Sequence, residues 1–485
     1  MPDAFFQSQK KRKRPNRAGG SSSRPAPRKP RAAARDEELA SDDEAGAANI
    51  EIDDMDFTAG RRPAALDDDE FVDTNETAAE KRVRLARGYL DKVRQDIEEE
   101  HAEDDFDAAE IDKELIASRL RQEVDEAEGR IHRFVSSAEV TASRFASTQH
   151  VPTGVAMTAT GQVYVSTKNG SVLRFDRATL KSPSRLPGGE HKGAIYAVAA
   201  SEDGKWVVTG GADKLVGVWR DGEWVTGMRG HKDAVSSVVF PPLANQSAHV
   251  LSASLGRHLA LHSLSTLSAL DTFFGHQDAV PSVSALKPTA AVTAGGRDRT
   301  CRWWKVEEEV QLVLRSGGKT RDGEREYVEG SVDVVCALDD SHFVSGGDTG
   351  TICLWSTGKK KPIYSKVLAH GTDTDGHNSL VESTKEPAPR WITALAALRG
   401  TNLFASGSWD GHVRLWAMDA ELRTFKPAGE FELGGFVNAL QILQLDDTIV
   451  LTAAVGREPR LGRWISLKKA RNGLFVASLD IKSDV

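Results

Sequence analysis

The sequence ADKLVGVW at residues 212–219 decides the fold, because two later stretches repeat its pattern. Residues 297–304 read RDRTCRWW and residues 409–416 read WDGHVRLW. In each stretch an Asp stands six residues before the final Trp, and apolar residues recur between the two. Short apolar runs that follow a polar turn are typical of buried strands. The three stretches are therefore predicted to be equivalent strands of a repeated unit.

The repeat extends from about residue 151 to the end of the chain. GTICLW at 350–355 is a further copy, and upstream of three copies a Gly-His or Glu-His pair precedes a strand start by four residues. Those histidines are His191, His231 and His276. With weaker copies included, the strand ends lie 42 to 61 residues apart, at 175, 219, 262, 304, 355, 416 and 464.

This unit resembles the WD40 repeat, a four-stranded blade of about 40–45 residues. Seven copies predict an all-β, seven-bladed WD40 propeller over residues 136–485. Two segments are candidates for closing the ring. Residues 473–481 could supply the fourth strand of the last blade, and residues 130–135 could also add one.

A buried polar network is expected to stabilise each blade, because WD40 blades link a His, a Ser or Thr, an Asp and the Trp by hydrogen bonds. An unpaired buried polar group costs about 1–3 kcal/mol, so such a set is kept or lost together. These residues are therefore interpreted as structural rather than catalytic. The complete set is predicted in one blade, as His191, Thr209, Asp213 and Trp219.

Three other blades are expected to be incomplete. The blade ending at Trp304 has Ala294 where the hydroxyl belongs. The blade ending at Trp416 keeps Ser406 and Asp410 without a His, and the blade ending at Trp355 has Thr349 in the Asp position.

Residues 1–79 are predicted to be a disordered basic and acidic tail. Residues 10–35 contain eleven Lys or Arg and no acid, and residues 36–79 contain sixteen Asp or Glu. Such segments cannot bury enough apolar surface to offset their ordering entropy. The basic start is typical of a nuclear import signal, and a basic RNA-binding arm or a merely solvated tail is the alternative. The import signal would comprise Lys10, Lys11, Arg12, Lys13 and Arg14.

Residues 80–135 are predicted to form a helical arm, because apolar residues recur at three- and four-residue steps. The apolar stripe is too narrow for a core of its own. The arm would therefore lie on a partner protein or, alternatively, dock on its own domain. The stripe contains Val83, Ala86, Leu90, Val93, Ile97, Ile111, Leu115, Leu120, Val124 and Ile131.

Composition and motifs exclude several classes of protein. No apolar run is long enough for a transmembrane helix, and the basic start is not followed by the apolar core of a secretory signal. The three Cys form no CxxC pair, so neither a disulfide framework nor a zinc site is expected. No nucleophile elbow, zinc-protease or complete phosphate-binding motif occurs. The sequence therefore predicts no enzyme, no cofactor and no metal.

Charge directs attention to surface loops of the propeller. The net charge is −8, but residues 1–150 account for −10 and the remainder is slightly positive. Basic residues in turns suit contacts with phosphates, although ordinary solvated side chains give the same composition. Polar insertions are also expected at 315–328 and 369–390. The candidate RNA- or partner-binding residues are Arg297, Arg299, Lys359, Lys360, Lys361, Arg390, Arg463 and Arg471.

Several motifs are more specific than the WD40 pattern. EGSVDVV at 329–335, KKKPI at 359–363, LGRWI at 461–465 and IASRL at 116–120 together resemble the U3 small nucleolar RNA-associated WD-repeat protein family. The resemblance implies a non-catalytic component of the U3 ribonucleoprotein in the nucleolus, acting in precursor rRNA processing and small-subunit ribosome biogenesis.

The same resemblance implies the partners. They are the box B/C element of U3 RNA, a kink-turn-binding small nucleolar protein, and other small-subunit processome factors that meet the arm and tail. The alternative is a generic WD40 scaffold, such as a substrate receptor or chromatin adaptor, that binds a short acidic or phosphorylated peptide.

Overall fold

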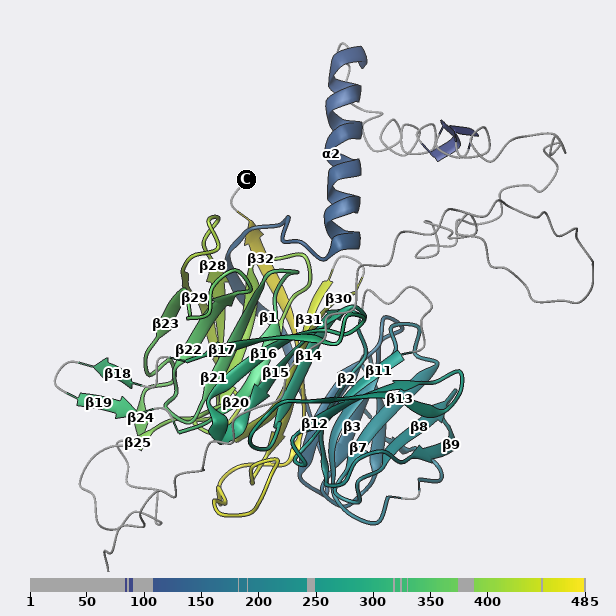
Figure 1. Ribbon diagram of the computed structural model, residues 1–485, viewed down its shortest axis with the longest axis vertical. Coiled ribbons are helices and arrows are strands. Elements are labelled where there is room, and N and C mark those ends of the chain that lie inside the picture. The colour runs from purple at the N-terminus through teal and green to yellow at the C-terminus, as the bar shows by residue number, and fades with distance from the viewer. Residues whose placement is uncertain are drawn as a thin grey trace, which may run out of the picture. The chain divides into compact units, whose positions relative to one another are not determined.

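The computed structural model describes residues 83–84, 87–89 and 108–483, except 182, 190, 242–248, 317–318, 323–324, 329, 374–387 and 446–447. Helix α2 (Ala108–Glu128) precedes seven four-stranded antiparallel sheets, which are the blades of a β-propeller (Figure 1). The all-β, seven-bladed prediction is confirmed. The predicted import signal and most of the first half of the helical arm lie outside the described residues.

The blades follow one another along the chain. Blade 1 is β2 (Pro152–Met157), β3 (Gln162–Thr167), β4 (Val172–Asp176) and β5 (Ser184–Arg185). Blade 2 is β6 (Ile195–Ala200), β7 (Trp206–Gly211), β8 (Val216–Arg220) and β9 (Glu223–Met228). Blade 3 is β10 (Val235–Val239), β11 (His249–Ser254), β12 (His258–Ser263) and β13 (Ser268–Phe274). Blade 4 is β14 (Ser282–Lys287), β15 (Ala290–Gly295), β16 (Thr300–Lys305) and β17 (Val310–Arg315), with the 3-10 turn η2 (Gly296–Asp298) between β15 and β16.

The remaining blades complete the ring. Blade 5 is β20 (Val332–Ala337), β21 (His342–Gly347), β22 (Ile352–Ser356) and β23 (Tyr364–Lys366). Blade 6 is β26 (Ile392–Ala397), β27 (Leu403–Ser408), β28 (His412–Met418) and β29 (Phe425–Glu432). Blade 7 is β30 (Phe436–Leu445), β31 (Thr448–Gly456), β32 (Gly473–Ser483) and β1 (Val135–Ser147). Two short hairpins, β18 (Lys319–Asp322) with β19 (Arg325–Val328) and β24 (Thr372–Asp373) with β25 (Ala388–Pro389), occupy the predicted insertions.

Glycines allow neighbouring blades to approach closely. A Cβ added at Gly210 in β7 would lie 2.6 Å from Val235, the first residue of the next blade. Gly346 has the same relationship to Ile392, and Gly407 has it to Val437. In these three blades, a glycine near the end of the second strand thus makes room for the first strand of the next blade.

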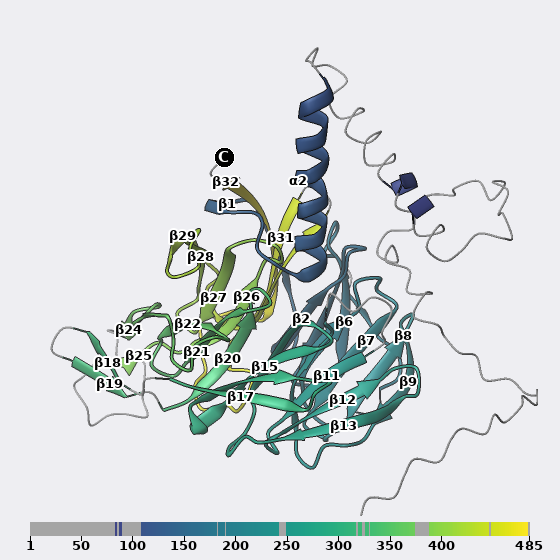
Figure 2. The same ribbon diagram turned by 45° about the horizontal axis from the view of Figure 1, so that its top comes forward.

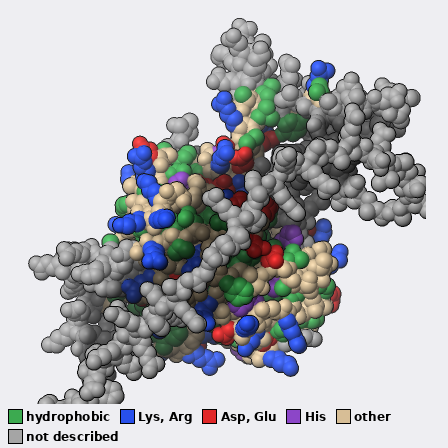
Figure 3. Space-filling model, viewed as in Figure 1, with side chains coloured by type: hydrophobic (Ala, Val, Ile, Leu, Met, Phe, Trp, Pro, Cys, Tyr) green, Lys and Arg blue, Asp and Glu red, His purple; other side chains and the backbone are tan. Residues whose placement is uncertain are grey.

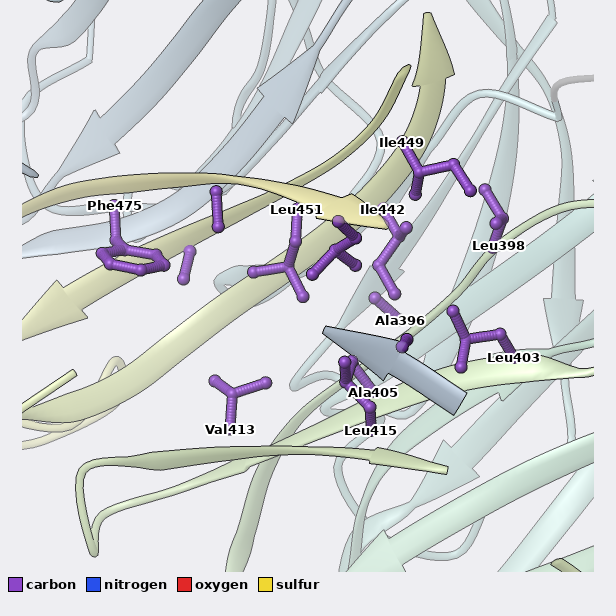
Figure 4. Packing of buried hydrophobic residues seen from close by; sticks show 14 of the residues in the cluster. Ala396, Leu398, Leu403, Ala405, Val413, Leu415, Ile442, Ile449, Leu451 and Phe475 are labelled. Atoms are coloured by element: carbon purple, nitrogen blue, oxygen red, sulfur yellow. The ribbon is translucent and has the colours of Figure 1, made fainter. Parts of the chain in front are cut away.

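The hydrophobic core is divided among the seven contacts between adjacent blades. Between blades 6 and 7, Val413 and Leu415 pack with Leu451 and Ile442 (Figure 4). Because each blade is covered on both sides, its inner strands are buried on both faces. Truncating one of these leucines to Ala is expected to cost about 2–5 kcal/mol of unfolding free energy.

Blade 7 is closed by the two ends of the propeller sequence. Strand β1 pairs antiparallel with β32 from Val135↔Ser483 to Ser147↔Gly473 (Figure 2). Residues 473–483 are therefore the third strand of the last blade, not the fourth, and the closing strand begins at Val135 rather than lying within 130–135. Trp464 is not a strand end, because a long loop at 457–472 separates β31 from β32.

The polar network is complete in two blades that were expected to lack a member. In blade 4, Thr293 rather than residue 294 supplies the hydroxyl, which lies 2.8 Å from both His276 Nε2 and Trp304 Nε1. The ring of His276 also lies 2.7 Å from Asp298.

Blade 6 has the same arrangement, so the expectation that it lacks a His is wrong. His370 lies 2.8 Å from the Ser406 hydroxyl and 2.9 Å from Asp410, and the Trp416 indole donates to Ser406 at 2.8 Å. Burial raises the pKa of the Asp410 carboxyl, but the hydrogen bonds from His370 and His412 and the nearby positive charges together outweigh burial and lower it below its usual value.

Blades 2 and 5 contain variants of this polar network. In blade 2, His191 contacts Thr209 and Asp213 as expected, whereas the Trp219 indole donates to the carbonyl of Pro187 instead. In blade 5, Trp355 donates to Ser345, and the hydroxyl of Thr349 has no hydrogen-bond partner.

In blade 3 no carboxylate takes part in the network. Ser252 lies between His231 and His262, at 2.6 and 2.7 Å, and His258 lies 3.0 Å from His231. Burial lowers the pKa of His231 to about 3 and that of His262 to about 4.

Candidate nucleic-acid interface

Loops that carry most of the predicted basic residues share one end of the propeller. Because the strands are antiparallel, connections between second and third strands lie at the same end as connections between blades. We call this end the loop face. It includes the η2 turn of blade 4 and the loop at residues 457–472, which we call the β31–β32 loop. The opposite end contains the β26–β27 connection, where Arg399 donates to the carbonyl of Glu126 in α2 and lies 3.2 Å from Glu202.

Arg460 anchors the β31–β32 loop across the central channel. Its guanidinium donates to the carbonyl of Ser236 in blade 3 at 3.1 Å and to that of Pro281, just before blade 4, at 3.0 Å. Burial lowers the pKa of the Arg460 guanidinium, and the charge of Asp333 in blade 5 opposes that shift. Burial raises the pKa of Asp333 to about 6, while the cation of Arg460 acts in the opposite direction. One loop of blade 7 is thus attached to the far side of the ring.

A second set of contacts fixes the loop at its own side. Lys168 lies 3.2 Å from Glu458 and donates to the carbonyl of Gly462 at 2.7 Å. Arg463 lies 3.6 Å from the same carboxylate, yet its side chain is 78% exposed. Arg471 is also exposed. The predicted Arg463 and Arg471 therefore present their charge to solvent from a loop that is held in place.

The η2 turn places two more predicted arginines on the loop face. Arg297 and Arg299 are both exposed, and the backbone amide of Arg297 donates to Asp278 at 2.9 Å. Arg299 has a left-handed backbone with φ of 55° and follows the three-residue 3-10 turn. The turn therefore holds both side chains outward on the loop face.

The predicted lysines lie next to blade 4, in a connection between a third and a fourth strand, and therefore do not belong to the loop face. Lys359, Lys360 and Lys361 are exposed in the connection between β22 and β23. The carbonyl of Lys360 accepts from the amide of Arg315 at 3.2 Å, and Ser316 donates to the carbonyl of Arg299. These contacts link the lysines to the η2 turn through the end of β17. Lys and Arg side chains are spread over the region of β22, β23, β28 and β29 (Figure 3).

Arg390 is engaged within its own blade. Its guanidinium donates to the carbonyl of His370 at 3.4 Å, lies 3.9 Å from Asp410 and sits 5.9 Å from the centre of the Trp409 ring. The side chain is only 25% exposed. Arg390 thus supports the polar network of blade 6 and offers less free charge than the other predicted residues.

Three features of the interface were not predicted from sequence. Sequence alone does not single out Lys168 and Arg315, because neither belongs to a basic cluster in the sequence. The repeat pattern predicts a strand end at Trp464, whereas the residue lies in the β31–β32 loop and is 48% exposed. The Gly462 that precedes it, with φ of +79°, was the available sign of a turn.

Other kinds of site are not found in the part of the chain described. No group of three or more His, Cys, Asp or Glu there is arranged to hold a metal ion. All three cysteines are buried with free thiols. None of the described helices has the length and apolar character needed to cross a membrane.

Comparisons with known proteins agree with this architecture. The model of the WD domain, G-beta repeat, matches residues 185–220, 267–305 and 380–417. The solved structure titled "Crystal structure of RRP9 WD40 repeats" is 31% identical, with a TM-score of 0.61. That match covers 72% of this chain and 100% of the other.

Two relatives match a larger share of the chain than this solved structure does. An uncharacterised WD repeat-containing protein of Schizosaccharomyces pombe is 38% identical, over 85% of this chain and 87% of its own. A U3 snoRNP-associated protein-like protein of Arabidopsis thaliana is 33% identical over 85% and 87% of the two chains. The seven blades, the specific motifs and these relatives lead to one conclusion: the chain belongs to the U3 small nucleolar RNA-associated WD-repeat protein family.

Proposed function

We propose that this protein is a non-catalytic component of the U3 small nucleolar ribonucleoprotein. It would act in precursor rRNA processing and small-subunit ribosome biogenesis, in the nucleolus. Its propeller would bind the box B/C element of U3 RNA together with a kink-turn-binding small nucleolar protein. The helical arm and N-terminal tail would meet other processome factors.

The observation that carries this proposal is the anchored cationic loop at the mouth of the channel. Arg460 and Lys168 hold the β31–β32 loop at both sides of the ring, so exposed Arg463 and Arg471 have a fixed placement. Fixed cations bind phosphates with little loss of side-chain and loop entropy. A folded RNA with a defined backbone path is the partner that gains most from such an arrangement.

The position of α2 supports the binding of different partners at the two ends of the propeller. Its last turn contacts the β26–β27 connection, at the end opposite the loop face. Val124 in α2 is 52% exposed. A protein partner could therefore bind the arm while RNA occupies the loop face, without competition for surface.

Salt dependence of RNA binding tests the proposal. The protein is titrated with box B/C RNA, with and without the kink-turn-binding protein, between 50 and 200 mM salt. Replacing Arg463 and Arg471 by Ala should weaken binding and reduce the slope of log K against log salt by about two, one for each phosphate contact. The matched control replaces Lys181 and Lys426, which are exposed near the opposite end. An equal effect of both pairs, or none of either, would contradict the proposed placement.

The alternative function, a generic peptide-binding scaffold, predicts a different outcome of ribonuclease treatment. Such a propeller would keep its partners after ribonuclease treatment of a cell extract, whereas the U3 component would lose those that are held through RNA. Loss of association with the kink-turn-binding protein on treatment supports the proposed function.

A further inference from the structure

We propose that Trp464 forms a stacking site for one unpaired nucleobase of the bound RNA. This inference rests on the proposed function and adds a specific contact to it. Trp464 is 48% exposed, whereas Trp219, Trp304 and Trp416 in the blades are at most 3% exposed. A large aromatic side chain left half in water, at the centre of a cationic loop, is arranged for contact with something outside the chain.

The indole of Trp464 is held by the backbone next to it. Gly462 has φ of +79°, and a Cβ added there would lie 1.9 Å from Cζ3 of Trp464. The ring therefore packs directly on the glycine. The carbonyl of Gly462 is itself fixed by Lys168, whose ammonium donates to it at 2.7 Å. Burial lowers the pKa of Lys168, and Glu458 opposes that shift.

A second aromatic ring supports the first from another blade. The ring centroid of Trp391, just before β26, lies 6.1 Å from that of Trp464, at an interplanar angle of 46°. The indole is thus fixed from blade 6 as well as from its own loop. A preorganised ring loses little entropy when a base stacks on it.

The surrounding charge favours a nucleotide over an apolar protein side chain. Arg463 adjoins the ring and is 78% exposed, and Arg457 and Arg471 are exposed in the same loop. Glu458, the acid of this loop, lies 3.2 Å from Lys168 and 3.6 Å from Arg463. An aromatic ring flanked by cations offers stacking to a base and ion pairs to the adjoining phosphates, which is how unpaired nucleotides are bound.

The first test measures affinity for box B/C RNA as a function of salt. Trp464→Ala should weaken binding about 5- to 150-fold, the range measured for loss of one stacked base. The salt slope should not change, because no phosphate contact is lost. Trp464→Phe should retain most of the affinity. Gly462→Ala should approach the loss of Trp464→Ala, since the added methyl displaces the ring. Trp206→Phe, at the opposite end, is the control.

The second test locates the contact. RNA carrying 5-bromouracil at unpaired positions is irradiated with the full-length protein, and the crosslinked peptide is expected to contain residue 464. Unchanged affinity of Trp464→Ala, together with crosslinks elsewhere, would overturn the inference while leaving the proposed function intact. Loss of binding to the kink-turn-binding protein with RNA affinity unchanged would also overturn it, because the ring would then contact protein. Failure of the unmodified protein to bind RNA would instead refute the proposed function.

Discussion

Arg460 and Pro281 are joined across the channel: the guanidinium of Arg460 donates to the carbonyl of Pro281 at 3.0 Å. Arg460 belongs to blade 7 and Pro281 immediately precedes blade 4, so the bond fixes a surface loop to the opposite side of the ring. It explains how a loop of sixteen residues, 457–472, keeps a defined position without regular structure.

Arg460→Met should release this loop while the blades remain folded. Two hydrogen bonds from a charged group are lost, each worth about 1.5–3 kcal/mol, and most of that loss falls on local opening of the loop. Hydrogen exchange at residues 461–469 should accelerate, with the blade strands unchanged. Arg471→Met is the matched control, because Arg471 lies in the same loop and is exposed. Equal exchange in both variants would show that Arg460 is not the anchor.

Ser406→Ala should destabilise the protein more than Ser345→Ala. Ser406 serves both His370 and Trp416, whereas Ser345 serves Trp355 alone. Leaving two buried groups unpaired should cost about 2–4 kcal/mol, against about 1–2 kcal/mol for one. Urea denaturation of the two variants provides the comparison. A Ser345 variant that is as unstable as the Ser406 variant would argue against the network as the cause.

Acid should destabilise the protein through blade 3. Burial lowers the pKa of His262 from 6.5 to about 4, so the folded chain keeps this imidazole neutral while the unfolded chain binds a proton. The free energy of unfolding therefore falls as the pH drops from 6.5, the ordinary pKa of His, to about 4, the pKa of His262 in the folded chain. The decrease is up to about 1.4 kcal/mol per pH unit for each such His.

The variant His262→Trp tests this assignment. It places in blade 3 the residue found at the equivalent position of blades 4 and 6, where the indole donates to a hydroxyl. The decrease in melting temperature between pH 7 and pH 5 should become smaller than in the unmodified protein. An unchanged decrease would assign the acid sensitivity to other groups.

Removal of residues 1–147 should prevent stable folding, whereas removal of residues 1–128 should not. The longer deletion takes away β1, leaving β32 as an open edge and exposing the core that Val135 and Ala138 help to bury. Thermal unfolding of the two truncated proteins is compared. A single cooperative transition in both would show that the ring does not depend on the closing strand.

Replacement of Lys359, Lys360 and Lys361 by Ala should weaken recovery of U3 RNA and flatten its salt dependence. All three are exposed, and the carbonyl of Lys360 accepts from the amide of Arg315 at the end of β17 in blade 4. The salt slope should fall by up to about three. Unchanged recovery from 50 to 200 mM salt would remove these lysines from the interface.

The periodic sequence pattern predicted the seven blades, because each buried third strand leaves an apolar run after a polar turn. The predicted members of the polar network were wrong where the spacing between them in the sequence differs from that of blade 2. In blade 4 the turn η2 separates Thr293 from Asp298 by five residues instead of four, which moved the expected hydroxyl to the wrong residue. In blade 6 the insertion places His370 thirty-six residues before Ser406, too far for recognition by spacing.

The candidate interface was less predictable than the fold. Basic residues could be identified as loop residues from sequence, but their side-chain partners depend on contacts between distant blades. Arg390 could not be distinguished from Arg463 by sequence, although one is held by Asp410 and the other faces solvent. The anchoring role of Arg460 likewise depends on carbonyls that lie 224 and 179 residues away in the chain.

The most direct test of the central claim is crosslinking of the protein to RNA in cells, followed by sequencing of the bound fragments and mapping of the crosslinked peptides. We expect fragments from the box B/C region of U3 RNA, attached to peptides from the β31–β32 loop and the η2 turn. Absence of U3 fragments, or crosslinks confined to the opposite end of the propeller, would contradict the account.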